Sequence, residues 1–158
     1  MEELFSVPNT DYLVRVAARL GAAALLGGLI GFERERVGKA AGLRTHMTVA
    51  LGCATFMLVA LESSSDAGNV SRAIQGIAAG IGFIGAGTIL KRDDDTDIKG
   101  LTTAAGIWMT AAVGAAAGAG HGWLGLFGVL IAFLILSILS GVDTWLAKKR
   151  GRRPKAEG

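Results

Sequence analysis

The stretch from Gly76 to Leu90 constrains this chain most, because it is almost wholly apolar and has glycines at positions 76, 80, 82, 85 and 87. In water, each interior glycine weakens a helix by roughly 1 kcal/mol relative to alanine. In a bilayer an apolar segment must be helical, since its backbone groups find no water there. Glycines then let a second helix approach closely. We therefore predict that this stretch is the central, most enclosed helix of a small membrane bundle.

The composition supports a membrane protein of the all-α class. Hydrophobic residues make up 51% of the 158 residues and charged residues 18%, with the charges grouped between long apolar runs. We expect one transmembrane domain over residues 1–146 and a disordered basic tail over residues 147–158. The acidic N-terminal residues do not resemble a secretory signal, and the single Cys53 has no partner for a disulfide or a zinc site.

Five apolar segments are long enough to cross a bilayer, which takes about 20 helical residues. They are Leu13–Phe32, Thr45–Leu61, Ala73–Leu90, Leu101–Gly118 and Trp123–Val142. Thirteen of the sixteen lysines and arginines lie in the 33–44 loop, the 91–100 loop and the tail, which all fall on one side of such a bundle. The positive-inside rule then predicts an external N-terminus and a cytoplasmic C-terminus in the bacterial inner membrane.

Small residues recur four apart in three of the segments, a pattern typical of helix contacts. We expect helix packing at these positions, and a homo-oligomer, most simply a two-fold dimer. The glycines concerned are Gly27, Gly31, Gly76, Gly80, Gly82, Gly85, Gly87, Gly106, Gly114 and Gly118, and the third segment carries the stripe Ala78, Gly82 and Ala86. The fifth segment is rich in Leu, Ile and Phe and is expected to face membrane lipids.

Most polar side chains map to the cytoplasmic ends of the segments. The predicted cytoplasmic-face cluster contains Glu33, Arg34, Glu35, Arg44, Thr45, His46, Thr88, Thr102 and Thr103. A charge at membrane depth needs a partner, so Glu33 is expected to pair with Arg34 or Arg44. An ion-pair network that pins the loops and a site for a ligand or partner both remain open. His46 is interpreted as a hydrogen-bonded interfacial residue, and Arg19 as a side chain that extends to the outer interface.

The 91–99 loop has an acidic run that gives a weak metal hypothesis. Asp93, Asp95 and Asp97 match the first ligands of an EF-hand, but Ile98 and Ala104 stand where that motif needs Gly and Glu. A solvated loop is therefore favoured over a Mg²⁺ site. Residues 80–85 match the dinucleotide pattern G-x-G-x-x-G, yet helix-like sequence lies on both sides, so a nucleotide site is disfavoured. Neither nucleic-acid binding nor a cofactor is predicted.

Four motifs occur in a fixed order along residues 20–120. They are Gly27-Gly-Leu-Ile-Gly-Phe-Glu-Arg-Glu35, Gly42-Leu-Arg-Thr-His46, Gly80-Ile-Gly-Phe-Ile-Gly-Ala-Gly-Thr-Ile-Leu90 and Gly100-Leu-Thr-Thr-Ala-Ala105 with Trp108. Together they resemble the MgtC/SapB family of bacterial membrane proteins. The resemblance implies an inner-membrane protein of four or five spans. It also implies links to growth under Mg²⁺ limitation, to virulence through survival inside phagocytes, and to restraint of the F-type ATP synthase.

The chain departs from the virulence-type members of that family at two positions. It has Thr102 where they tend to have Asn, and Met109 where they tend to have Cys. Those members also carry a soluble C-terminal domain, and this chain is expected to be a short form without it. These differences weaken the transfer of the virulence and ATP-synthase roles but leave the expected fold unchanged.

Two hypotheses for function follow, and neither is an enzyme, because no pairing of a nucleophile with a base is found. The first is a regulatory membrane protein that acts through helix contacts with itself and with a partner complex. The second is a small transporter or channel for Mg²⁺ or another solute. Pores usually carry polar residues at membrane depth. The predicted helix centres offer few besides Thr55 and Thr110, which favours the regulator.

Overall fold

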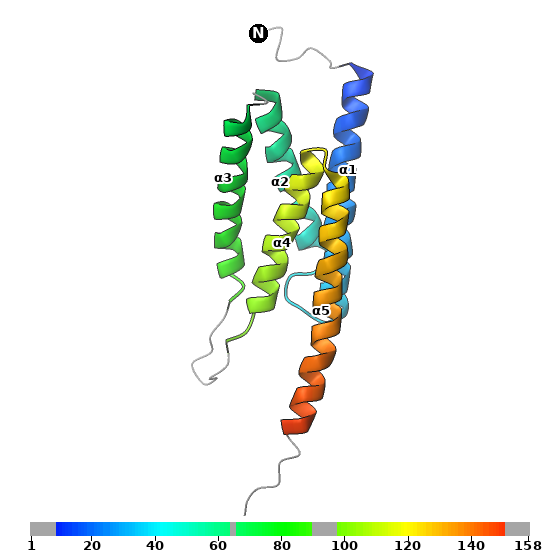
Figure 1. Ribbon diagram of the computed structural model, residues 1–158, viewed down its shortest axis with the longest axis vertical. Coiled ribbons are helices and arrows are strands. Elements are labelled where there is room, and N and C mark those ends of the chain that lie inside the picture. Colours follow the sequence, from blue (N-terminus) through cyan, green and yellow to red (C-terminus); the bar gives the residue numbers. More distant parts are fainter. Residues whose placement is uncertain (1–8, 64–65, 90–97, 151–158) are drawn as a thin grey trace, which may run out of the picture.

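The computed structural model is an all-helical bundle, as the sequence predicts, and it describes residues 9–63, 66–89 and 98–150, with side chains as far as Ser137. Its five helices are α1 (Thr10–Arg36), α2 (Leu43–Ser63), α3 (Ala67–Ala86), α4 (Leu101–Gly118) and α5 (Gly122–Arg150). Figure 1 shows that α1 begins at one end of the bundle and α5 ends at the other. α5 continues past the predicted span end at Val142, and residues 151–158 lie outside the described chain.

Local signals in the sequence fix several helix ends. The side chain of Asn9 caps α1 by accepting a hydrogen bond from the Asp11 amide, and Asp66 caps α3 through the Gly68 amide. Gly120 ends the tight turn between α4 and α5 with a φ of 87°, which favours glycine. This turn places α4 and α5 side by side in opposite directions.

The central helix is α4, not α3, so the prediction that the 76–90 stretch is central was wrong. α4 packs against all four other helices, whereas α3 contacts α2 and α4 at one edge of the bundle (Figure 1). More than half of the residues of α4 are buried, but in α3 only Ile81 and Gly85 are. The glycine pattern predicts a surface suited to close approach. It does not say whether that surface faces the bundle.

The glycines of α3 are largely open in the described chain, Gly76 and Gly80 on the side toward α2 and Gly82 on another side of the helix. A Cβ atom added at Gly76, Gly80 or Gly82 would meet nothing within 4 Å. Gly85 is the exception, because it lies in ordinary van der Waals contact with Ala104 of α4. The stripe through Gly82 therefore does not pack within the chain, and α3 stands partly clear of its neighbours.

By contrast, α2 is held tightly between α1 and α4. A Cβ at Gly27 of α1 would lie 2.7 Å from the His46 carbonyl oxygen, and a Cβ at Gly114 of α4 would lie 2.3 Å from the Ala50 carbonyl oxygen. Gly118 meets the next turn of α2 at 2.5 Å in the same way. These distances leave no room for a side chain, so the three helices touch backbone to backbone.

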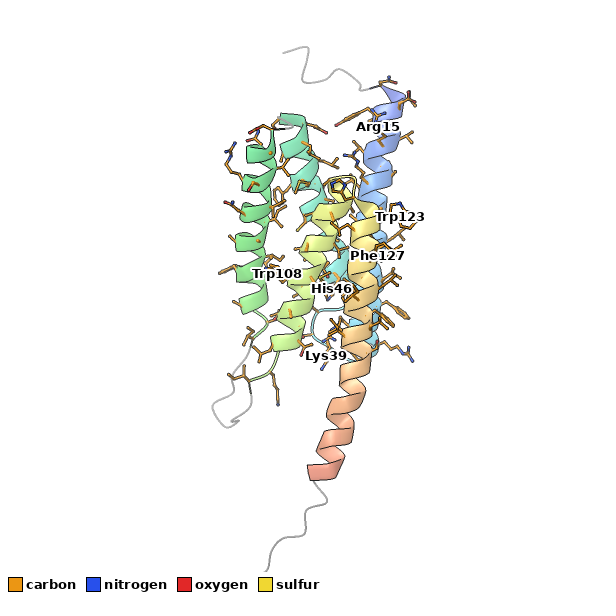
Figure 2. All side chains as sticks on the ribbon, viewed as in Figure 1. Arg15, Lys39, His46, Trp108, Trp123 and Phe127 are labelled. Carbon is orange, nitrogen blue, oxygen red and sulfur yellow. The ribbon has the colours of Figure 1, made fainter. Side chains whose placement is uncertain are left out.

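Three helices meet the length and hydropathy expected of membrane spans, namely α1, α2 and α4, and α5 is apolar over residues 122–137. α3 is not among the three, because its first turns carry Asn69, Ser71, Arg72 and Gln75. Large apolar side chains cover the outside of the bundle. Figure 2 shows Trp123 and Phe127 of α5 pointing outward, as expected for a lipid-facing helix, together with Trp108 of α4, which is 53% exposed rather than packed.

At the end of the bundle where α1 begins, this helix is tied to its neighbours by polar side chains. Arg19 donates a hydrogen bond to the Gly118 carbonyl at 3.2 Å, which satisfies a backbone acceptor at the end of α4. The Tyr12 hydroxyl donates to the Glu62 carboxylate near the end of α2. Arg19 therefore caps a helix instead of simply extending to the interface.

Candidate functional site

Among the side chains that the structure describes, five polar ones are buried inside the bundle, and they come from α1, α2 and α4. This buried polar cluster consists of Glu33 and Arg34 of α1, His46 of α2, and Thr103 and Thr110 of α4. Figure 2 shows His46 between the helices. A polar group in an apolar interior is costly unless it is hydrogen-bonded, so each contact in this cluster matters for stability or for binding.

His46 is fully buried and bonds to the middle of α4. Its Nδ1 atom lies 2.7 Å from the Thr110 hydroxyl, and that hydroxyl donates its own proton to the Gly106 carbonyl at 2.9 Å. The Thr110 hydroxyl therefore links the imidazole of His46 to the backbone of α4. The second ring nitrogen, Nε2, is buried and makes no ordinary hydrogen bond within the described chain.

His46 is thus not the interfacial residue that we predicted. His46 lies one turn after Leu43, where α2 begins. The contact between Gly114 and Ala50 sets the register of the two helices and places Leu43 level with Ile107. Because α4 begins at Leu101, α2 begins almost two turns further into the bundle than α4. Because the start of α2 lies inside the bundle, a side chain one turn along it is enclosed by α1 and α4.

Glu33 and Arg34 form the buried ion pair that the sequence predicts. Arg34 Nη1 lies 3.5 Å from Glu33 Oε2, and both side chains are almost completely buried. Adjacent residues on a helix point in different directions, so this pair makes a single long contact rather than a two-pronged one. The other two nitrogens of the guanidinium, Nε and Nη2, have no partner.

Glu35 has a different role from that of the cluster. Its Oε2 atom accepts a hydrogen bond from the Leu43 amide at 2.8 Å, so it caps the N-terminus of α2 across the connecting loop. Gly31 lies one turn earlier and would bring a Cβ to 2.8 Å from the Cα of Leu43. These two contacts fix where α2 begins, and so they position His46.

The structure does not bring the remaining predicted residues into the cluster. Arg44, Thr45 and Thr102 are exposed, and the Thr88 hydroxyl donates to the Gly85 carbonyl of its own helix. The reason is helical phase: residues next to His46 and Thr103 in sequence point away from the buried face. A Cβ atom added at Gly106 would lie 3.5 Å from Cε1 of the His46 ring. Gly87 follows α3, and a Cβ there would meet only backbone of that helix.

The structure does not test the weak Mg²⁺ hypothesis for the 91–99 loop, because Asp93, Asp95 and Asp97 lie outside the described residues. Within the described part of the chain, no group of three or more His, Cys, Asp and Glu side chains is close enough to hold a metal ion.

Sequence reasoning missed Thr110 as a site residue. Thr110 had been noted as a polar residue at mid-helix and as part of a small-residue stripe, but not as the partner of His46. The available signal was a hydroxyl on the same helical face as Gly106 and Gly114. A polar residue within a stripe that packs closely must find its partner on the facing helix.

Comparison with known proteins matches residues 20–145 to the MgtC family. Protein SrpB of Synechococcus elongatus is 44% identical over 142 residues, covering 83% of this chain and 78% of SrpB. The Escherichia coli K12 protein named putative magnesium transporter YhiD is 43% identical and is covered over 63% of its length. Protein MgtC of Brucella abortus is 42% identical over 142 residues, which are 88% of this chain and 58% of that protein.

The chain thus spans less than two thirds of the length of YhiD and of Brucella MgtC. No solved structure matches it significantly. The matched region runs from the second half of α1 into α5 and contains every residue of the buried polar cluster. The resemblance inferred from the four motifs is therefore confirmed, and the protein is a membrane protein that belongs to the MgtC family.

Proposed function

We propose that this protein is a non-enzymatic regulator in the bacterial inner membrane, linked to adaptation to Mg²⁺ limitation, and that it acts by helix contacts with membrane partners. The observation that carries the proposal is the contrast between a closed core and the open glycines of α3. Gly27 and Gly114 are in contact with α2, whereas Gly76, Gly80 and Gly82 of α3 meet nothing. Small residues on an exposed helix face let a further helix approach closely.

A groove beside α3 supports the same proposal. α3 stands off from α2 and leaves an apolar space of about 670 Å³ whose walls include Gly52, Cys53, Phe56, Gly76 and Gly80. A second copy of this chain is the simplest occupant, which would give a two-fold dimer. The family resemblance adds the F-type ATP synthase as a candidate partner, and membrane lipids contact the remaining outer surface.

The core offers little support for a Mg²⁺ pathway. Mg²⁺ prefers oxygen ligands in near-octahedral geometry. In the buried polar cluster the carboxylate of Glu33 is already paired with the Arg34 guanidinium, whose positive charge opposes a second cation. Beyond this cluster, α2 and α4 touch through backbone at Gly114 and Gly118, which closes that interface.

The link to magnesium comes from relatives. One relative is named putative magnesium transporter YhiD, and that name favours the second candidate, a Mg²⁺ transporter. The orientation is part of the proposal as well. With thirteen of sixteen bases on one side, we place the N-terminus outside and the C-terminus in the cytoplasm.

Growth and flux measurements separate the two candidates. The regulator predicts that Glu33→Ala abolishes growth at limiting Mg²⁺ while the variant remains in the membrane, because Arg34 is left buried without its partner. Asp11→Ala is the matched control and should grow normally, because Asp11 is exposed and its amide, which Asn9 caps, is kept. Wild-type protein in liposomes should move no Mg²⁺. Saturable Mg²⁺ flux that is lost in Glu33→Ala would replace the regulator with the transporter.

Partner contacts are tested by photocrosslinking in native membranes. A crosslinking residue at position 80, on the open face, should capture a second copy or another membrane protein. The same residue at exposed position 130 on α5 should capture mainly lipid. Equal protein capture from both positions would contradict a specific role for α3.

A further inference from the structure

The α3 helix carries the most exposed of the large apolar side chains that the structure describes. Phe83 is 85% exposed, against 67% for Phe56 and 61% for Phe127. It belongs to the helix at the edge of the bundle, which packs only against α2 and α4 within the described chain (Figure 1). An aromatic ring that projects from a helix is a typical anchor of an interface when a pocket exists to receive it.

Such a pocket lies on the same helix. The apolar groove between α2 and α3 has a volume of about 670 Å³, and its α3 wall consists of Ala73, Gly76, Ile77, Gly80, Ile81 and Ile84. A Cβ atom added at Gly76 or Gly80 would meet nothing within 4 Å, so the wall leaves space that this chain does not fill. The atoms that line this space lack closely packed partners on one side, which favours an occupant.

Helical phase places the ring and the groove on opposite sides of Gly80. Successive residues of an α-helix are about 100° apart, so Phe83 lies about 60° to one side of Gly80. Ile77 and Ile84, which line the groove, lie about 60° and 40° to the other side. Gly80 stands between the ring and the groove, and because it has no side chain it lets another helix approach closely.

A two-fold axis makes this arrangement self-complementary. Two copies inserted in the same direction are related by an axis perpendicular to the membrane, so their α3 helices run parallel. A half-turn about this axis brings the Phe83 side of one helix opposite the groove side of the other and leaves heights in the membrane unchanged. Side chains on a helix lean towards its N-terminus, which brings the Phe83 ring level with Gly80.

We propose that two copies of this chain pair through α3, with Phe83 of each copy inserted in the groove of the other beside Gly80. Two identical contacts then form at once, as a closed two-fold interface requires. Lipid chains are as apolar as the ring, so the stabilisation comes from close packing in the groove. This inference rests on the helix contacts of the proposed function and names the groups that make them.

The first test removes the ring. The full chain in mild detergent is examined by native mass spectrometry over a range of protein concentrations. Phe83→Ala should raise the dissociation constant of the dimer roughly tenfold or more, because an anchor leaves its pocket. Phe127→Ala removes an exposed ring of α5 and is the matched control, which should change this constant by less than about twofold.

The second test fills the groove. Thr48 is exposed and lines the groove from the α2 side, so Thr48→Phe places a ring of the same chain in the pocket. This variant should weaken the dimer as much as Phe83→Ala does. Thr55→Phe adds the same ring at an exposed position of α2 outside the groove walls, and the dissociation constant should then stay unchanged.

Mixing the two weakened variants tests the pairing itself. Phe83→Ala keeps an open groove and Thr48→Phe keeps the ring at position 83. One complete contact can therefore form between unlike chains, and none can form between like chains. Heterodimers differ in mass from both homodimers, and they should exceed the share that random pairing gives. Their formation also shows that both variants are folded.

Three results would overturn the inference. The first is a wild-type chain without dimers at any concentration. The second is an equal effect of Phe83→Ala and Phe127→Ala, which would assign the ring to lipid contact. The third is a mixture with no excess of heterodimers. Neither growth at limiting Mg²⁺ nor Mg²⁺ flux is measured in these tests, so this inference and the regulator can fail independently.

Discussion

Gly114→Ala tests whether backbone contact between α2 and α4 holds the core together. The added Cβ would lie 2.3 Å from the Ala50 carbonyl oxygen and 2.6 Å from the Ala50 Cα. Real Cβ atoms do not approach other atoms closer than 3.0 Å, so the two helices must move apart by about 0.7 Å. The clash is with backbone, and no rotamer change relieves it.

The expected effect follows from two opposing terms. Overpacking a well-packed core costs about 1–3 kcal/mol, and alanine in place of glycine returns up to about 1 kcal/mol of helix propensity. We therefore expect Gly114→Ala to lower the free energy of unfolding by about 1–2 kcal/mol. The matched control is Gly82→Ala, which gains the same propensity and meets nothing within 4 Å. It should be neutral or stabilising by up to about 1 kcal/mol.

The assay is unfolding of the purified protein in mild detergent by titration with sodium dodecyl sulfate, followed by circular dichroism. The two variants should differ by about 2 kcal/mol, with Gly114→Ala the less stable. If Gly114→Ala unfolds at the same denaturant fraction as Gly82→Ala, the close approach of α2 and α4 is refuted. The same result would remove the register that places His46 beside Thr110.

Three further predictions use the same measurement or a mass measurement. Thr110→Val should lower the free energy of unfolding by about 1–3 kcal/mol, because the buried Nδ1 atom of His46 loses its hydrogen-bond partner. Thr55→Val, whose hydroxyl bonds its own helix, should change the free energy of unfolding by less than about 0.5 kcal/mol. Arg19→Gln should cost about 1 kcal/mol by freeing a carbonyl at the end of α4, with exposed Arg15→Gln as its neutral control. Gly82→Leu should reduce the dimer fraction in native mass spectra without unfolding the monomer; a wild-type protein that is monomeric at every concentration would contradict the dimer.

The helices were predictable from the sequence because membrane spans are recognised by their length and their apolar composition. α4, for example, has the predicted bounds, Leu101–Gly118. The position of each helix was not predictable in the same way. α1, α3 and α4 all carry small residues four apart. This spacing indicates that one face of the helix can pack closely, but it does not identify the helix that packs against it. Ala50 and Ala54 of α2 are also four apart, and they form the surface on which both neighbours pack.

The candidate site was predicted in part for a similar reason. Glu33 and Arg34 are neighbours in sequence, so their pairing follows from the cost of a lone charge in the membrane. His46 and Thr110 are brought together only by the register of α2 against α4, which depends on glycine contacts one and two turns away. Arg44 and Thr102 were included because they lie at the same end of the predicted helices, and helical phase directs them outward.

The three helices that touch backbone to backbone are not consecutive, because α3 lies between α2 and α4 in the chain. During synthesis α1 and α2 therefore enter the bilayer as a pair that lacks its third member. The 64 residues from Ala50 to Gly114 take roughly 3–13 s to translate at 5–20 residues per second. Throughout that interval His46 has no Thr110 beside it. Assembly of the core thus waits for α4, and α3, already synthesised, takes its place at the edge.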